Sequence, residues 1–184
     1  MTIRDSEIGG CGLSCRLCPS YHTEAASRCG GCKSKMRMAV GCPFITCAVK
    51  KKGIEFCWDC EESITCEKWG KHRDAGKQHD SFKCYQKLED DIRFIQKNGV
   101  DKFKETQKLR EQLLAKILKE FNEGPSKSYY CIAATVLGIE ELEEAIDRAT
   151  KESTGLDIRV KSKVMHLMLD AIAQKNGYSL KLRK

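Results

Sequence analysis

The chain has 184 residues, of which 41% are hydrophobic and 32% are charged, and its formal net charge is +7. This length and composition are typical of one globular domain of ordinary size or of two small ones. The longest uninterrupted apolar stretch, residues 129–134, is far shorter than a membrane span requires, and the first ten residues lack the apolar segment of a secretory signal. We therefore expect a cytoplasmic protein with no membrane association.

Cysteine is concentrated at the N-terminal end of the chain. There are 12 cysteines, and ten of them precede residue 67. Residues 1–84 also hold far fewer aliphatic and aromatic side chains than residues 85–184. A segment with so little apolar material needs cross-links or bound metal to fold. We therefore divide the chain into a cysteine-rich zinc-binding region, 1–84, and a helical domain, 85–184.

Three Cys-x2-Cys pairs favour metal over disulfides. The pairs are Cys15/Cys18, Cys29/Cys32 and Cys57/Cys60. In such a pair a tight turn directs both sulfurs at one ion, about 2.3 Å from each. Cytosolic thiols are also kept reduced, which disfavours disulfides.

The simplest partition of these cysteines gives two sites of four thiolates each. The first site contains Cys15, Cys18, Cys29 and Cys32. The second site contains Cys42, Cys47, Cys57 and Cys60. Cys11 and Cys66 are left over: they could replace one of these ligands, bridge two metals or lie buried as small apolar residues.

A third site is conceivable from ligand types alone, but its spacing is loose. It would contain Cys66, His72, His79 and Cys84. Because both histidines lie in a polar stretch, GKHRDAGKQHD, we interpret them as exposed linker residues.

Zinc is the expected ion, because four thiolates in a closed tetrahedral shell suit a redox-inert structural metal. The competitor is a 4Fe-4S cluster held by Cys11, Cys15 and Cys18, whose spacing matches that of radical enzymes using S-adenosylmethionine. Pro19, directly after Cys18, also matches the last cluster ligand of bacterial ferredoxins. Those radical enzymes need a large barrel domain, for which the rest of the chain is too short.

Bound metal would also change the net charge of the protein. Eight thiolates and two dications would lower the formal charge of +7 by four, and acidic residues are mixed with basic ones in both halves. The lysine run 50–52 is more typical of a solvated loop than of a phosphate-binding site. We therefore do not expect nucleic-acid binding, since no stripe of basic and aromatic residues is present.

Residues 85–184 show helical periodicity throughout. Leu88, Ile92 and Ile95 predict a first helix that ends at Gly99. A second helix, capped by Asp101, is predicted to end at Gly124-Pro125, with Leu109 extending its apolar stripe. The segment YYCIAATVL is apolar nearly all round and predicts a buried central helix.

Two further helices and a tail complete this half. The fourth helix is expected to bury Leu142, Ala145, Ile146 and Ala149. The fifth is expected to bury Val164, Leu167, Met168, Ala171 and Ile172, and to end at Gly177. Tyr178, Leu180 and Leu182 then alternate, as in a short edge strand or a clasping tail, and LDIRV at 156–160 could pair with them.

The predicted fold is therefore a small metal-stabilised, irregular cysteine-rich region of zinc-ribbon or knuckle type, followed by an all-α helical bundle. Cys131 is expected to be a packing residue of that bundle. Its neighbourhood, SKSYYC, is a weaker candidate for a small ligand site at a helix N-terminus.

The cysteine string resembles a prokaryotic family, domain of unknown function (DUF) 3795. The resemblance rests on CGLSCRLCPSY from Cys11, CGGC from Cys29, CPFITCA from Cys42 and FCWDCEESITC ending at Cys66. The proline that precedes the last cysteine of the family pattern is Thr65 here. The resemblance implies a small zinc-binding domain, implies no reaction, and returns Cys11 and Cys66 to the possible ligands.

These observations favour a non-enzymatic zinc protein, with two structural ions and a helical half that binds a protein partner. No HExxH or related pattern indicates a catalytic zinc. The alternative is an iron–sulfur or thiol-based redox protein or enzyme that uses Cys11, Cys15 and Cys18.

Overall fold

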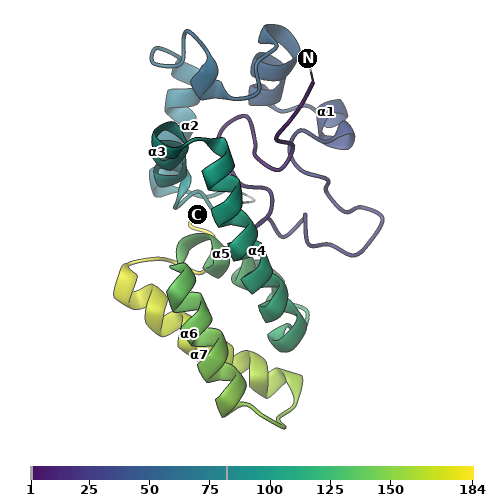
Figure 1. Ribbon diagram of the computed structural model, residues 1–184, viewed down its shortest axis with the longest axis vertical. Coiled ribbons are helices and arrows are strands. Elements are labelled where there is room, and N and C mark those ends of the chain that lie inside the picture. The colour runs from purple at the N-terminus through teal and green to yellow at the C-terminus, as the bar shows by residue number, and fades with distance from the viewer. Residues whose placement is uncertain (1, 82) are drawn as a thin grey trace.

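The computed structural model describes residues 2–81 and 83–184, and its regular elements are helices (Figure 1). They are α1 (Lys35–Val40), the π-helix η1 (Ile45–Lys52), the 3-10 helix η2 (Cys57–Asp59), α2 (Glu67–Gln78), α3 (Leu88–Asn98), α4 (Val100–Phe121), α5 (Lys127–Val136), α6 (Ile139–Glu152) and α7 (Ile158–Asn176). The described residues contain no β-strand, and Ile8 and Ser14 form an isolated antiparallel bridge.

The cysteine-rich segment is thus irregular, as expected, but a zinc ribbon is not shown, because a ribbon requires strands. Figure 1 shows long loops with short helices at one end of the molecule and α5, α6 and α7 at the other. The long helix α4 lies along the middle of the molecule, between these two ends, and contacts α3, α5, α6 and α7. It is therefore the element that both halves share.

The helical half has a conventional apolar core, as its sequence predicts. Helix α5 is buried on nearly every side, and the four expected positions of α6 are buried. From α4 the core receives Leu114, Ile117 and Phe121. Leu17 of the cysteine-rich segment is buried in the same core, so the two halves share apolar contacts.

Two expectations about apolar faces in this half are partly wrong. On α7 the most deeply buried apolar side chains are Met165, Leu169 and Ala173. Of the expected residues, Leu167 is 70% exposed and Ala171 is exposed, while the others are half-buried and pack against the core: Val164, Met168 and Ile172. On α4 the apolar stripe does not extend to Leu109, which is 51% exposed. Both helices carry apolar residues over a wide arc. The sequence therefore does not decide between two possible buried faces that are about 100° apart around the helix axis.

The segment interpreted as a polar linker is instead the helix α2. Trp69 is buried and packs with Leu88 and Ile92 of α3. Arg73 lies over the Trp69 ring and donates two hydrogen bonds to Glu89, of 2.6 and 2.7 Å. One aromatic anchor and one bidentate ion pair thus hold a helix whose sequence is mostly polar.

The C-terminal tail is a clasp, not a strand. Asp157, expected in a strand, caps α7 by accepting from the backbone N–H groups of Arg159 and Val160. Arg183 donates to both carboxylate oxygens of Asp80, from Nε at 3.0 Å and from Nη2 at 3.1 Å. Because the Asp80 side chain is fully buried, the tail is fastened to the end of α2.

Further contacts join the two halves. Ile8 and Phe56 pack with Ile95 and Phe103 of α3 and α4 in a second apolar cluster. Lys104 of α4 also forms a 2.8 Å ion pair with Asp5. Within the residues described, no helix is both long and apolar enough to cross a membrane.

Candidate metal centre

Glycines shape the loop that carries the Cys29/Cys32 pair. Gly31 has φ +104°, and a Cβ atom there would lie 2.6 Å from the backbone oxygen of Ser6. Only glycine fits a left-handed position so close to another backbone segment. The CGGC sequence therefore allows this turn to pack closely against the backbone at Ser6, which places the turn beside Cys15.

The four cysteines predicted for the first site converge on a shared set of cations. The backbone N–H of Cys32 donates to Cys15 Sγ at 3.1 Å. Lys83 Nζ donates to Cys32 Sγ at 3.2 Å, and its charge also acts on Cys18 and Cys15. Arg37 Nε donates to Cys29 Sγ at 3.4 Å. Residues from three separate segments thus meet around these sulfurs.

The electrostatics of this cluster favour negative sulfur. A hydrogen bond from Cys15, together with Lys83 and Arg37, lowers the pKa of Cys32 to about 5, although burial opposes the shift. The same hydrogen bond and burial raise the pKa of Cys15. Cys32 is therefore the more acidic of the two thiols, and the cations beside it favour the thiolate, which is the form that binds metal.

The remaining cysteines of the string form a second, looser group around Cys57. The thiol of Cys57 interacts electrostatically with Cys11, Cys66, Cys47 and Cys60, and burial raises its pKa to about 12. Lys52 donates to Cys60 Sγ at 3.2 Å. Cys42 lines one surface hollow together with Cys47, a member of this group.

Cys11, left over by the spacing argument, lies between the two groups. A Cβ atom at Gly9 would be 3.6 Å from both Cys11 Sγ and Cys32 Sγ. Trp69 Nε1 donates to the backbone oxygen of Cys11 at 3.4 Å, and burial raises the pKa of the thiol to about 12. Cys11 is therefore placed to serve either group, which spacing alone could not reveal.

The interpretation of His72 as an exposed linker residue is wrong. Its ring lies between Phe44 and Tyr85, with centroid distances of 4.7 and 5.1 Å. Burial lowers its pKa, and its buried Nε2 has no hydrogen-bond partner among the described residues. A neutral imidazole with a free ring nitrogen is a competent metal ligand. His79, in contrast, is exposed as expected.

The donor set fits zinc in type, while the arrangement of the side chains is not that of a closed cage. Thiolates with N–H groups donating to them match a structural zinc site and its surrounding hydrogen bonds. Within the described ranges, no group of three or more His, Cys, Asp or Glu side chains has metal-binding geometry. The ligand set and the choice of zinc therefore stay predictions.

Cys84 and Cys131 lie outside both groups and line a cavity at the junction of the halves. Burial raises the pKa of Cys131 to about 12, so its thiol is protonated and unreactive at neutral pH. This is the environment expected of a packing residue.

The fold and these thiols define a cysteine-rich, mostly helical protein. Residues 7–71 match the model of a family described as protein of unknown function (DUF3795), which confirms the resemblance over the segment that carries the ten clustered cysteines. No curated protein and no solved structure matches the chain.

Proposed function

We propose that the chain is a zinc-binding protein whose ions organise the cysteine-rich segment, and that it serves as an interaction module rather than an enzyme. The observation that carries the proposal is the convergence of Cys15, Cys18, Cys29 and Cys32 with Lys83 and Arg37. The segment has little apolar core of its own. A metal ion bound by these buried thiols would supply the stability that such a core otherwise gives.

The second ion is proposed for the group around Cys57. Cys42, Cys47, Cys57 and Cys60 are its ligands by spacing, and Cys11 or Cys66 could replace one of them. The proximity of Cys57 to both Cys11 and Cys66 supports that exchange.

The Ser126–His166 pair supports the non-enzymatic assignment. His166 Nε2 lies 2.9 Å from Ser126 Oγ, as a base lies beside a nucleophile. Ser126 Oγ, however, donates to Glu123 at 2.6 Å. Because a hydroxyl has one proton, the histidine must donate to this serine and cannot accept from it.

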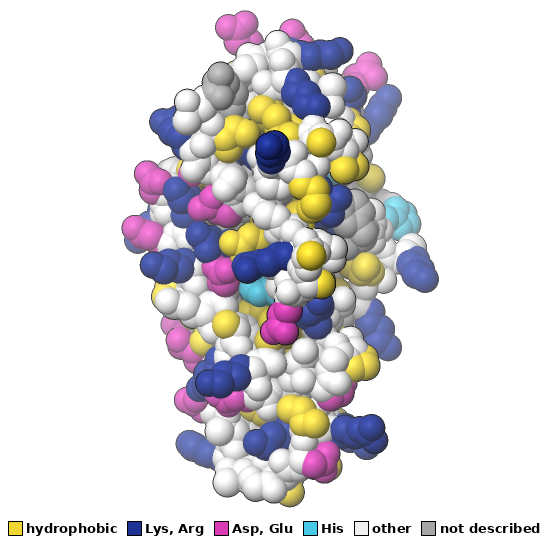
Figure 2. Space-filling model, turned by 90° about the vertical axis from the view of Figure 1, so that its right-hand side faces the viewer, with side chains coloured by type: hydrophobic (Ala, Val, Ile, Leu, Met, Phe, Trp, Pro, Cys, Tyr) yellow, Lys and Arg dark blue, Asp and Glu magenta, His cyan; other side chains and the backbone are white. Residues whose placement is uncertain are grey.

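The surface seen in Figure 2 supports a partner other than nucleic acid. Lysine and arginine side chains are scattered there among aspartate, glutamate and uncharged side chains. A continuous basic stripe, the usual footprint of a phosphate backbone, does not run across this face.

Metal analysis of protein purified under anaerobic, reducing conditions tests the proposal. We expect two zinc ions per chain, one zinc ion in Cys15→Ser, and two in Cys131→Ala, whose thiol lies outside both groups. Protein that contains neither zinc nor another ion would refute it.

The same preparation tests the iron–sulfur alternative, which the position of Cys11 beside the first group favours. A brown protein with iron, acid-labile sulfide and a visible absorbance band would establish that alternative. A colourless protein with zinc would exclude it.

A further inference from the structure

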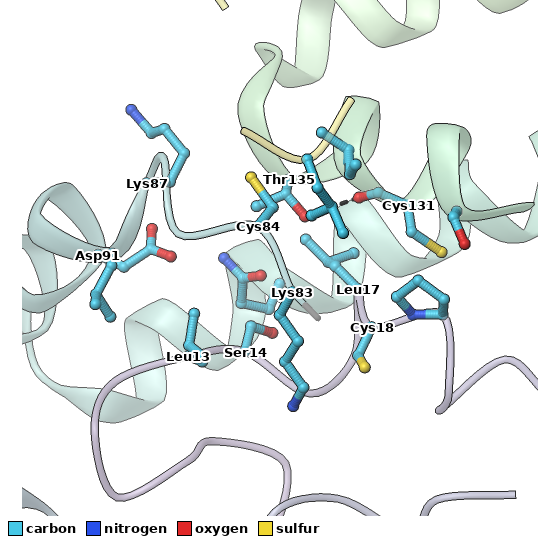
Figure 3. Close-up of a pocket in the computed structure, with 16 residues that line it drawn as sticks. Leu13, Ser14, Leu17, Cys18, Lys83, Cys84, Lys87, Asp91, Cys131 and Thr135 are labelled. Carbon is cyan, nitrogen blue, oxygen red and sulfur yellow. Dashed lines mark hydrogen bonds between the residues drawn. The ribbon is translucent and has the colours of Figure 1, made fainter. Parts of the chain in front are cut away.

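The junction between the two halves contains a cavity of about 60 Å³. It is lined by the loop at residues 13–19, by residues 83–91, and by α4, α5 and the C-terminal tail (Figure 3). A cavity needs about 10–15 Å³ for each water molecule, so this one has room for roughly four to six non-hydrogen atoms.

Two polar side chains in its wall have no partner. Gln107 of α4 is 4% exposed, and its Oε1 accepts no hydrogen bond from the described residues. Ser14 Oγ, also buried, has none either. Burying such groups without a hydrogen-bond partner is unfavourable, so the wall of the cavity favours a polar occupant.

Asp91 of α3 is the third polar group of this wall. In Figure 3 its carboxylate points toward the side of the pocket that holds Lys83 and Cys84. Burial raises its pKa to about 7, against the opposing charges of Arg110 and Lys87. Its neutral form, which donates as well as accepts, is therefore populated near neutral pH.

The charges around the cavity favour a neutral occupant. Lys83 donates to Cys32, and Lys87 is bound to Asp90 and Tyr178. Figure 3 shows both ammonium groups directed away from the centre of the pocket, so an anion would lack a partner. The guanidinium of Arg110, held by the carbonyl oxygens of Ala134 and Leu137, acts on Asp91 and disfavours a second cation beside it.

We propose that this junction pocket binds a small neutral amide, of about six non-hydrogen atoms, with its N–H and C=O edge at Gln107, Ser14 and Asp91. Each of these three groups can both donate and accept, which matches an edge that does the same. The apolar body of the ligand lies against Leu13, Leu17 and Ile132, which also line the cavity.

Titration of the full chain, as purified with its metal, tests the proposal by two-dimensional amide NMR. The probes are three molecules of one shape: isobutyramide, isobutyrate and methyl isopropyl ketone. Isobutyramide is expected to shift the amide signals of Leu17, Asp91 and Cys131 saturably. Isobutyrate and the ketone are expected to bind at least about fivefold more weakly, since each loses the donor.

A matched pair of variants on α4 completes the experiment. Gln107→Met keeps the side-chain length and removes the amide, and should weaken isobutyramide about 5- to 10-fold. Gln112→Met, at an exposed position of the same helix, should leave binding unchanged. Ser14→Ala gives a second reading should Gln107→Met not fold, with a similar loss expected.

Three results would overturn the proposal. They are the absence of saturable shifts at the pocket, equal binding of the ketone, which would indicate an unselective apolar hollow, and unchanged amide binding in both Gln107→Met and Ser14→Ala. The second and third results leave the zinc assignment untouched, because neither depends on the thiols.

Discussion

Asp80 is the residue on which the C-terminal clasp depends. Its fully buried carboxylate accepts from the Arg183 guanidinium and from the backbone N–H groups of Arg183 and Tyr85. We expect Arg183→Met to lower the free energy of unfolding by about 3 kcal/mol, because it leaves a buried charge without its ionic partner. Urea unfolding measures this, and Lys181→Met, two positions away and exposed, should change little.

The same pair predicts a pH dependence with a definite sign. Burial would raise the pKa of Asp80, but the hydrogen bonds from Arg183 and Tyr85 outweigh it and lower the pKa below its ordinary value. A group with a lowered folded pKa stabilises the fold above its unfolded pKa, about 3.9, and loses that contribution as the pH falls. The difference in stability between the wild type and Arg183→Met should therefore shrink below about pH 4. A difference that stays constant down to pH 2 would contradict the assignment.

Gly12 offers a separate test of the packing beside Cys11. Its φ is +110°, and a Cβ atom there would lie 2.8 Å from Ile92 Cγ1. Gly124 has φ +113°, yet nothing lies within 4 Å of a Cβ atom placed on it. Both alanine variants carry backbone strain of about 1–2 kcal/mol, and Gly12→Ala adds an overpacking cost of about 1–3 kcal/mol. Thermal unfolding should rank Gly12→Ala as the less stable, and equal midpoints would argue against the contact.

At the residue scale, the local Cys-x2-Cys spacing predicts pairs of metal ligands, and this pairing stays a prediction. The sequence does not indicate the cations that lie beside these sulfurs. Lys83 lies 51 residues from Cys32, and Lys33 lies 22 residues from its buried partner Glu55. The residues next to such a lysine in sequence do not indicate that it will be buried, because most lysines lie at the surface.

At the scale of elements, apolar periodicity predicts α3, α5 and α6 well and fails where the pattern is broad or absent. Helix α2 is missed because its stability comes from Trp69 and from the Arg73–Glu89 pair, not from an apolar stripe. The buried face of α7 is misassigned because apolar residues on both sides of Met165 make two lines equally plausible. Tertiary packing on α6 selects one of them.

The face of α7 gives a clear prediction. Leu169 is fully buried, so Leu169→Ala should cost about 2–5 kcal/mol through lost burial and a residual cavity. Leu167, expected inside by periodicity, is 70% exposed, and Leu167→Ala should cost less than about 0.5 kcal/mol. Chemical unfolding of the two variants measures both values. A larger loss of stability in Leu167→Ala than in Leu169→Ala would support the buried face that the sequence predicted.

At the scale of the whole molecule, the two halves depend on each other unequally. The helical half supplies nearly all of its own core; among the described residues of the cysteine-rich segment, Leu17 is buried in that core and Cys84 packs against it. The apolar side chains of the cysteine-rich segment, in contrast, pack on α3 and α4: Ile8 and Phe56 do so in one cluster and Trp69 in another. Its folding should therefore respond to metal far more than that of α5, α6 and α7.

Chelation under reducing conditions separates these contributions. Structural zinc contributes about 10–16 kcal/mol in finger peptides, as much as the roughly 5–15 kcal/mol that stabilises an entire domain. A strong chelator should therefore collapse the amide NMR dispersion of the cysteine-rich segment. Signals from α5, α6 and α7 should stay dispersed, with small shifts where Leu17 and the Arg183 clasp are lost.

Cys131→Ala is the control for this experiment, because it removes a buried thiol that belongs to neither cysteine group, and it should respond to the chelator as the wild type does. A spectrum that the chelator leaves unchanged would show that the loops hold themselves without metal. Loss of every dispersed signal would show instead that the helical half does not stay folded without the cysteine-rich segment. Its core would then require Leu17 and the Arg183–Asp80 contact.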